Sequence, residues 1–305
     1  DPPGVAGRPA RGAPGDAEAV DAGPAPADEA EAIGRRFAGV GYSGDMRDPR
    51  QATWLAGAGL RDDRLRVARL EATGRHGLQG YLRDPDRTLM NVEAIGLDFP
   101  FGLPLTFAEK ILGGPFPEEG WWALAKRLER MTWPDYLVAV QEYRDSVGES
   151  KRLTDERSSA VSPLHRVNPD LGSMTYHGIR MIAEDRSRFA VRPFESAQAR
   201  LLLEVYPGGL VKRLQIAGEE GGQGSRNQVI LQALARLEHL PVELDPSQAR
   251  HCLASRDALD AVIAARCAAA AVLGGEADRS PQELAPEEGE RVRLEGWIYG
   301  LEEPA

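Results

Sequence analysis

The sequence has few cysteines, no excess of basic residues and no long apolar run. Two cysteines, Cys252 and Cys267, cannot form a disulfide framework or a Cys-x-x-Cys metal site. Lys and Arg total 37 against 47 Asp and Glu, and a net charge of −10 argues against tight, sequence-independent binding of duplex DNA. The longest apolar stretch, residues 268–273, is too short to cross a bilayer. We therefore expect a cytoplasmic protein with no membrane partner.

The first 36 residues contain almost no large apolar side chain. Ala, Pro, Gly and Asp dominate this stretch, so burial cannot offset the entropy lost on ordering, and we predict a disordered tail over residues 1–36. Acidic residues and prolines also interrupt every place where a secretory signal would need a continuous apolar segment. A chain of 305 residues allows one large domain or two small ones. We expect a single domain over residues 37–305.

Short β-like segments come first in this domain. Residues 36–43, 52–59 and 65–73 are separated by links too short for a crossover helix, which predicts an antiparallel meander. A segment read as a link covers residues 77–89. An apolar run then ends at Asp98, because the prolines that follow cannot continue a strand or a helix.

Helical periodicity dominates from about residue 106 to 188, which predicts a helical insertion. Strand character returns at residues 199–206, and Pro207 places Glu204 near the end of that strand. Further on, Ser255 can cap a long alanine-rich helix. The C-terminal residues 291–301 are read as a final strand or an extended segment.

Four carboxylates occupy positions that could meet at one rim of a sheet. Asp98 and Glu204 lie at strand ends, and Asp257 and Asp260 share one face at the start of the alanine-rich helix. Hard cations such as Mg²⁺ or Mn²⁺ prefer oxygen ligands, and such a site suits phosphoryl transfer.

Each acid also has an ordinary structural interpretation. Asp98 could cap a turn, and Glu204 could face solvent on alternate positions of its strand. Asp257 and Asp260 would favour a helix dipole whatever the function. Between these two we prefer Asp260 as a ligand and Asp257 as a residue of the capping turn.

Several motifs stand out along the chain: GVGYSG (Gly39–Gly44), GLDFPFGLP (Gly96–Pro104), KRLTDE (Lys151–Glu156) with SPL (Ser162–Leu164), YHGIRMI (Tyr176–Ile182), LLLEVYP (Leu201–Pro207), RDALDAVIAA (Arg256–Ala265) and EGWIYG (Glu295–Gly300). Together they resemble the family catalogued as domain of unknown function 429, whose members are described as predicted nucleases of ribonuclease H-like fold. The resemblance implies an α/β fold in which a mixed sheet of three antiparallel strands is followed by parallel strands. It implies a catalytic set of Asp98, Glu204, Asp260 and Asp257, with the first three as ligands of Mg²⁺ or Mn²⁺. It also places Ser43, Arg152 and Asp155 at the substrate, where Arg152 would clamp a phosphate.

One position departs from the family pattern. Relatives carry Gly-Val-Asp-x-Ser-Gly on the first strand, whereas here Gly41 stands in place of the aspartate. The change removes a carboxylate that would bridge two metal ions. Asp45 would have to reach back through the Ser43–Gly44 turn to replace it.

Three functions therefore remain open. The first is a divalent-metal-dependent nuclease or phosphoryl-transfer enzyme, acting on a nucleotide or on short or single-stranded nucleic acid because the chain is acidic. The second is a catalytically altered module that binds a nucleotide, nucleic acid or protein, for which Gly41 is the main argument. The third is a nucleotide-dependent transferase in a biosynthetic pathway, since one fold hosts many activities.

Overall fold

The structure, a computed structural model, describes residues 34–42, 53–83, 91–166, 169–184, 189–196, 200–215, 222–278 and 284–301. Residues 33–305 form one compact unit. Residues 1–33 of the predicted tail lie outside the described residues, and Arg36, which the prediction assigned to that tail, is the first residue of a strand. None of the described helices has the length and apolarity needed to span a membrane.

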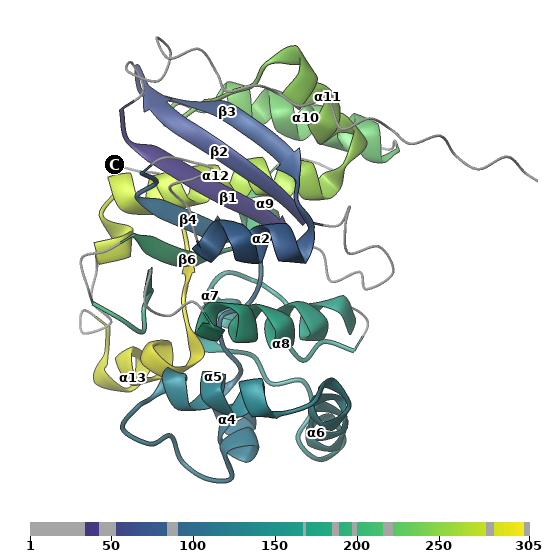
Figure 1. Cartoon of the computed structure of the whole chain (residues 1–305), viewed down its shortest axis with the longest axis vertical. Helices are drawn as coiled ribbons and strands as arrows, with labels where there is room; N and C mark the ends of the chain where they lie inside the picture. Colours follow the sequence, from purple (N-terminus) through teal and green to yellow (C-terminus); the bar gives the residue numbers. More distant parts are fainter. Residues whose placement is uncertain are drawn as a thin grey trace, which may run out of the picture. The chain divides into compact units, whose positions relative to one another are not determined.

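A mixed sheet forms the centre of the molecule (Figure 1). Strands β1 (Arg36–Tyr42), β2 (Thr53–Arg61) and β3 (Arg64–Ala72) form the predicted antiparallel meander. Strand β4 (Ala94–Leu97) pairs parallel to β1, and β6 (Leu201–Val205) pairs parallel to β4. Three two-residue strands complete the described sheet: β5 (Ala190–Val191), β7 (Val242–Glu243) and β8 (Ile298–Tyr299). The predicted α/β fold class is confirmed, because three antiparallel strands followed by parallel ones are the ribonuclease H-like arrangement.

One face of the sheet is covered by a long helix, α12 (Arg256–Leu273), which contacts β1, β2 and β4. The N-cap predicted at Ser255 is present, since its hydroxyl accepts a hydrogen bond of 3.2 Å from the Ala258 N–H. Alanines of α12 lie against β1, where a Cβ on Gly39 would overlap the helix backbone at Ala261 and Ala265. Small residues on both elements therefore bring the helix axis unusually close to the sheet. The helices α9 (Pro207–Arg213), α10 (Gln223–Ala235) and α11 (Pro246–Ala254) share this core.

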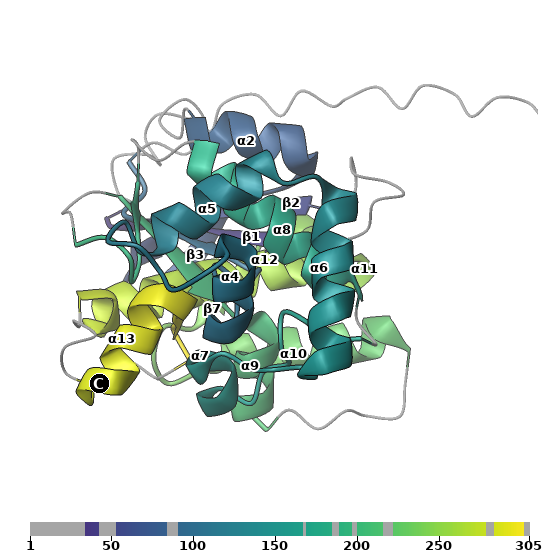
Figure 2. The same cartoon turned by 90° about the horizontal axis from the view of Figure 1, so that it is seen from below.

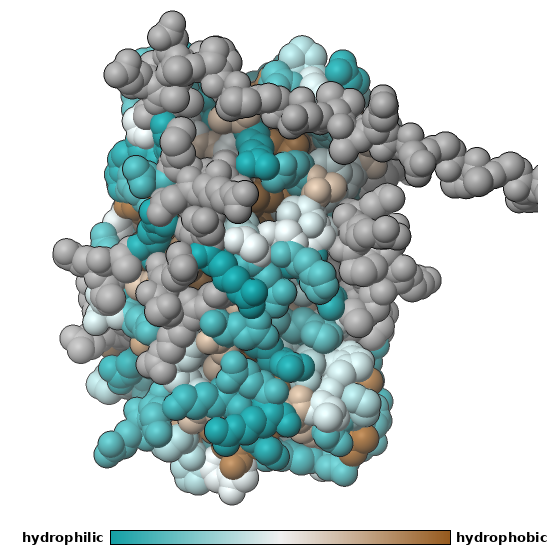
Figure 3. Space-filling view, viewed as in Figure 1, coloured by the Kyte–Doolittle hydropathy of each residue, from teal (hydrophilic) through white to brown (hydrophobic). Residues whose placement is uncertain are grey.

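The opposite face carries α2 (Gly74–Arg83) and the helical insertion, as Figures 1 and 2 show. The insertion occupies the range predicted for it. It consists of α4 (Leu105–Leu112), α5 (Trp121–Arg130), α6 (Trp133–Ser146), α7 (Leu153–Arg157) and α8 (Pro169–Glu184). The face of this half that Figure 3 shows is mostly hydrophilic, and many apolar side chains of the insertion pack with β1 and β4 in a core on this side of the sheet.

Two sequence-based predictions were wrong. Residues 77–83, read as part of a link, belong to helix α2, whose buried Leu78, Tyr81 and Leu82 have helical spacing. Its three glycines lower helix propensity, and packing against the sheet overrides that cost. The second error concerns residues 291–295, which form the end of α13 (Pro286–Glu295) rather than a strand. The signals for that helix were Pro286 in its first turn and the acids that follow it.

Candidate functional site

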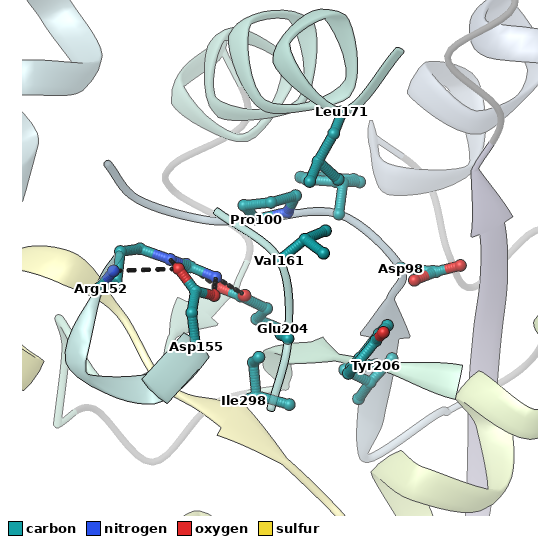
Figure 4. A pocket seen from close by; sticks show the side chains of 12 residues that line it. Asp98, Pro100, Arg152, Asp155, Val161, Leu171, Glu204, Tyr206 and Ile298 are labelled. Atoms are coloured by element: carbon teal, nitrogen blue, oxygen red, sulfur yellow. Dashed lines mark hydrogen bonds and ion pairs between the residues drawn. The ribbon is translucent and has the colours of Figure 1, made fainter. Parts of the chain in front are cut away.

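The predicted rim contains a small pocket at the carboxyl ends of β4 and β6 (Figure 4). Parallel strands end at the same edge of a sheet, so the residues that follow β4 lie beside the end of β6. The insertion contributes residues from α7 and α8 to the opposite wall. The lining residues are Asp98, Phe99, Pro100, Arg152, Asp155, Ala160, Val161, Leu171, Glu204, Val205, Tyr206 and Ile298.

Glu204 lies in a buried ion-pair network on one side of the pocket. Arg152 Nη2 lies 2.6 Å from Glu204 Oε1, and Arg152 Nη1 lies 2.8 Å from Glu204 Oε2. The same guanidinium donates from Nε and Nη2 to Asp155, over 3.1 and 2.7 Å. All three side chains are at most 3% exposed. Arg152 and Asp155 therefore line the pocket as parts of one network, and their role at a substrate stays a prediction.

This network places one positive charge, on Arg152, between two carboxylates. Burial lowers the pKa of Arg152, but the charges of Asp155 and Glu204 outweigh burial and raise it above its usual value. Burial raises the pKa of Glu204, and Arg152 opposes that shift. Every nitrogen of the Arg152 side chain already donates to a carboxylate, so none is left for a phosphate.

The network also positions the chain that follows Asp98. Glu204 Oε2 accepts a hydrogen bond of 2.8 Å from the Phe101 N–H. Glu295 at the end of α13 accepts from the N–H groups of Leu105 and Leu153, over 2.9 and 2.8 Å. Glu295 was not predicted as a site residue, because it falls in a segment whose sequence reads as extended. Its one signal was a position inside the EGWIYG motif.

Asp98 lies on the other side of the pocket from the ion pair (Figure 4). Its N–H donates to the Val40 carbonyl over 3.1 Å, which fixes it beside the end of β1. Burial raises the pKa of Asp98 well above its usual value, and the charges of Asp260 and Asp257 raise it further, while Arg256 opposes them. Asp98 therefore lies within electrostatic range of the two acids of α12, whose first turn meets the end of β1 where the Asp257 carbonyl faces Gly41.

The two acids of α12 differ in their partners. Asp260 pairs with Arg256, whose Nε donates to Oδ2 over 2.9 Å and whose Nη2 lies 2.8 Å from Oδ1. Burial and the charge of Asp260 raise the pKa of Asp257 to about 6. Within the described part of the chain, the carboxylates of Asp98 and Asp257 have no hydrogen-bond or ion-pair partner. These two oxygen donors are thus available to a ligand.

The position that lacks the expected first-strand acid faces the start of α12. A Cβ on Gly41 would lie well under 3.0 Å from the carbonyl oxygen of Asp257. A carboxylate at this position would therefore require the helix to move. Ser43 and Asp45, the other residues expected near this end of β1, lie outside the described residues.

These donors do not fit two metal ions held by the protein alone. Among the residues that the structure describes, no three His, Cys, Asp or Glu side chains are grouped closely enough to hold an ion. They do fit one hard cation, since Mg²⁺ often uses one or two carboxylates and completes its shell with water and substrate oxygens. The mutual repulsion that raises the pKa of Asp98 is what a cation would offset.

Fold and site together define an α/β protein with a ribonuclease H-like sheet and an acidic rim. The family model described as "Protein of unknown function (DUF429)" matches residues 45–285, and the chain belongs to that family. No curated protein and no solved structure matches the chain.

Proposed function

We propose that this protein is a metal-dependent phosphoryl-transfer enzyme that hydrolyses a phosphate ester. The observation that carries the proposal is the placement of Asp98 at the end of β1, through its hydrogen bond to the Val40 carbonyl, beside the start of α12, whose Asp257 carbonyl lies against Gly41. Like charges placed together in a partly buried site are unfavourable by themselves, and perturbed carboxylates of this kind cluster at functional sites.

Asp98 and Asp257 would hold one Mg²⁺ or Mn²⁺, with Asp260 available if it leaves Arg256. Such an ion, when bound, lowers the pKa of a water and stabilises charge on a phosphoryl oxygen. Glu204, expected from the sequence as a ligand, takes a positioning role here: through the Phe101 N–H it holds the chain that begins at Asp98. The apolar side chains of Val161, Leu171 and Ile298 would limit water at the reacting group.

The substrate we propose is a nucleotide or a short single strand of nucleic acid. A net charge of −10 repels a long polyanion, and the pocket is small. The extended backbone of duplex DNA would require many basic contacts to overcome this repulsion.

The test combines metal binding with turnover. We expect calorimetry to detect Mn²⁺ binding to the full chain, and a screen of nucleotides and short oligonucleotides to detect Mn²⁺-dependent release of phosphate or strand cleavage. Asp98→Asn should abolish both signals. The matched control is Asp63→Asn, an exposed turn residue with a φ of 57° that asparagine tolerates. Turnover that survives in Asp98→Asn would contradict the proposal.

A second function, a binding module without catalysis, is favoured by one observation. The space that a first-strand carboxylate would need is taken by the backbone of α12 at Asp257, so this part of a two-metal site is missing. In that case the pocket would bind a nucleotide without turnover in Mg²⁺ or Mn²⁺. Tight binding that persists in Asp98→Asn, with no product formed by the parent protein, would identify this alternative.

A further inference from the structure

A group of basic and aromatic side chains lies at the seam between α2 and α8, outside the pocket described above. The two helices are side by side, since Gln79 and Arg83 of α2 donate to Glu184 of α8 over 3.1 and 3.4 Å. Nearer the start of α2, the seam contains Arg75 together with His177 and Arg180 of α8. The last two belong to the YHGIRMI motif, for which the proposed function gives no role.

Aromatic rings, rather than acids, hold these three side chains. The Arg75 Cζ lies 5.5 Å from the ring centroid of Tyr42. The Arg180 Cζ lies 5.0 Å from the ring centroid of Tyr176, and Arg180 Nη1 donates to the Tyr176 hydroxyl over 2.6 Å. His177 packs edge-on against the same ring at 4.9 Å. No carboxylate of the described ranges is paired with any of the three.

Two polar atoms of the group have no partner. Arg75 Nη2 and His177 Nε2 are shielded from solvent and have no hydrogen bond within the described residues. Unsatisfied buried polar atoms are rare in native proteins and often mark a bound ion or water. Burial lowers the pKa of His177 to about 4, and the charges of Arg75 and Arg180 act in the same direction. The seam therefore carries positive charge that the described residues do not neutralise.

Two aromatic rings, Tyr42 and Phe99, connect the seam to the segment that follows Asp98. The ring of Tyr42 packs edge-on against Phe99, the residue after Asp98, with centroids 5.1 Å apart. Phe99 also packs against α8 at Gly178, where a Cβ would overlap its ring. Through Tyr42 and Phe99, Arg75 is thus connected to α8 at Gly178, the residue next to His177.

We propose that Arg75, His177 and Arg180 form a subsite for a phosphate group of the substrate that does not itself react. The proposal rests on the proposed function for the identity of the ligand. A phosphate dianion accepts paired hydrogen bonds from a guanidinium and a further one from a neutral imidazole N–H. It would supply the acceptors that Arg75 Nη2 and His177 Nε2 lack.

The test measures binding of pyrophosphate to the full chain, with a chelator present and no metal added. We expect calorimetry to detect binding that Arg75→Gln weakens about tenfold or more, the loss expected for a charge-assisted hydrogen bond. Arg75→Lys, which keeps the charge, should retain part of the affinity. The matched control is Arg83→Gln on the same helix, because Arg83 is paired with Glu184 at the other end of the seam.

Proton NMR gives a second readout. His177→Asn identifies the imidazole signals of His177, and pyrophosphate should raise the pKa of this residue from about 4. Equal affinity in the parent protein and Arg75→Gln, or an unchanged His177 titration, would overturn the subsite. Acetate that binds as tightly as pyrophosphate would overturn its selectivity for phosphate.

Asp98→Asn separates the two proposals. If it binds pyrophosphate normally and the parent protein has no hydrolytic activity, the proposed function fails and the subsite stands. If turnover is found but pyrophosphate binding does not depend on Arg75, the proposed function stands and the subsite fails.

Discussion

The carbonyl oxygen of Asp257 occupies the space that a side chain at Gly41 would need. The contact joins the end of β1 to the first turn of the helix that carries two of the three acids of the site. The absence of a carboxylate on the first strand therefore goes together with the close approach of α12 to β1. A protein with this packing cannot simply regain the aspartate, because the helix backbone would have to give way.

Gly41→Ala should destabilise the protein by at least about 1–3 kcal/mol, because overpacking against backbone forces the helix to shift. Urea unfolding of the two proteins measures the difference. The control is Gly80→Ala on α2, where an added Cβ meets nothing within 4 Å. It should stabilise the protein by about 0.5–1 kcal/mol through helix propensity. Equal stability of Gly41→Ala and the parent protein would show that α12 is not packed as described.

Glu204→Gln should cost about 1–3 kcal/mol of unfolding free energy, because it replaces a buried acceptor of charge-assisted hydrogen bonds from Arg152, while Asp155 still balances the charge of Arg152. The comparison is Glu93→Gln, which breaks the exposed pair with Arg35 and should cost about 0–1 kcal/mol. Chemical denaturation of both variants checks the ranking. Under conditions where Glu204→Gln remains folded, its affinity for Mn²⁺ should match that of the parent protein. A large loss of affinity would make Glu204 a ligand after all.

Asp98→Asn should raise stability by about 1–3 kcal/mol near pH 7 while it abolishes activity. The substitution keeps the shape of the side chain and removes a charge that burial, Asp260 and Asp257 all disfavour. Thermal unfolding with a chelator present measures the gain. A fall in the melting temperature would mean that the Asp98 carboxylate stabilises the fold.

Asp257 should make stability fall as the pH rises. Its pKa is about 6 in the folded protein and near 3.8 when unfolded, so the folded state binds more protons between these values. The resulting loss of stability should develop from about pH 4 to pH 6 and stay constant above that. Asp257→Asn should remove this dependence and be more stable by about 1 kcal/mol at pH 7. The gain is this small because Asp257 is partly exposed to solvent, which screens its charge. Chemical denaturation at several pH values in this range, on the parent protein, Asp257→Asn and the control Asp63→Asn, measures the dependence. If the stability of Asp257→Asn and that of the parent protein change with pH in the same way, the prediction is wrong.

Much of the architecture could be predicted from local patterns. The meander follows from short β-like segments with brief links, and the cap at Ser255 follows from the residue type before an alanine-rich run. Helix α2 could not be predicted in this way, because its glycines oppose a helix that only contact with the sheet stabilises. The end of α13 was misread because alternation in RVRLE resembles a strand.

The sequence by itself determined which acids end strands or begin a helix, because prolines, caps and periodicity act on neighbouring residues. It could not determine which of those acids pair with a basic side chain. Tertiary structure decided that Arg152 of the insertion engages Glu204, while Asp98 lies within electrostatic range of Asp257 and Asp260. The physical reason is that burial and charge pairing depend on distances between segments far apart in the chain, and the close packing of α12 on Gly41 sets those distances here.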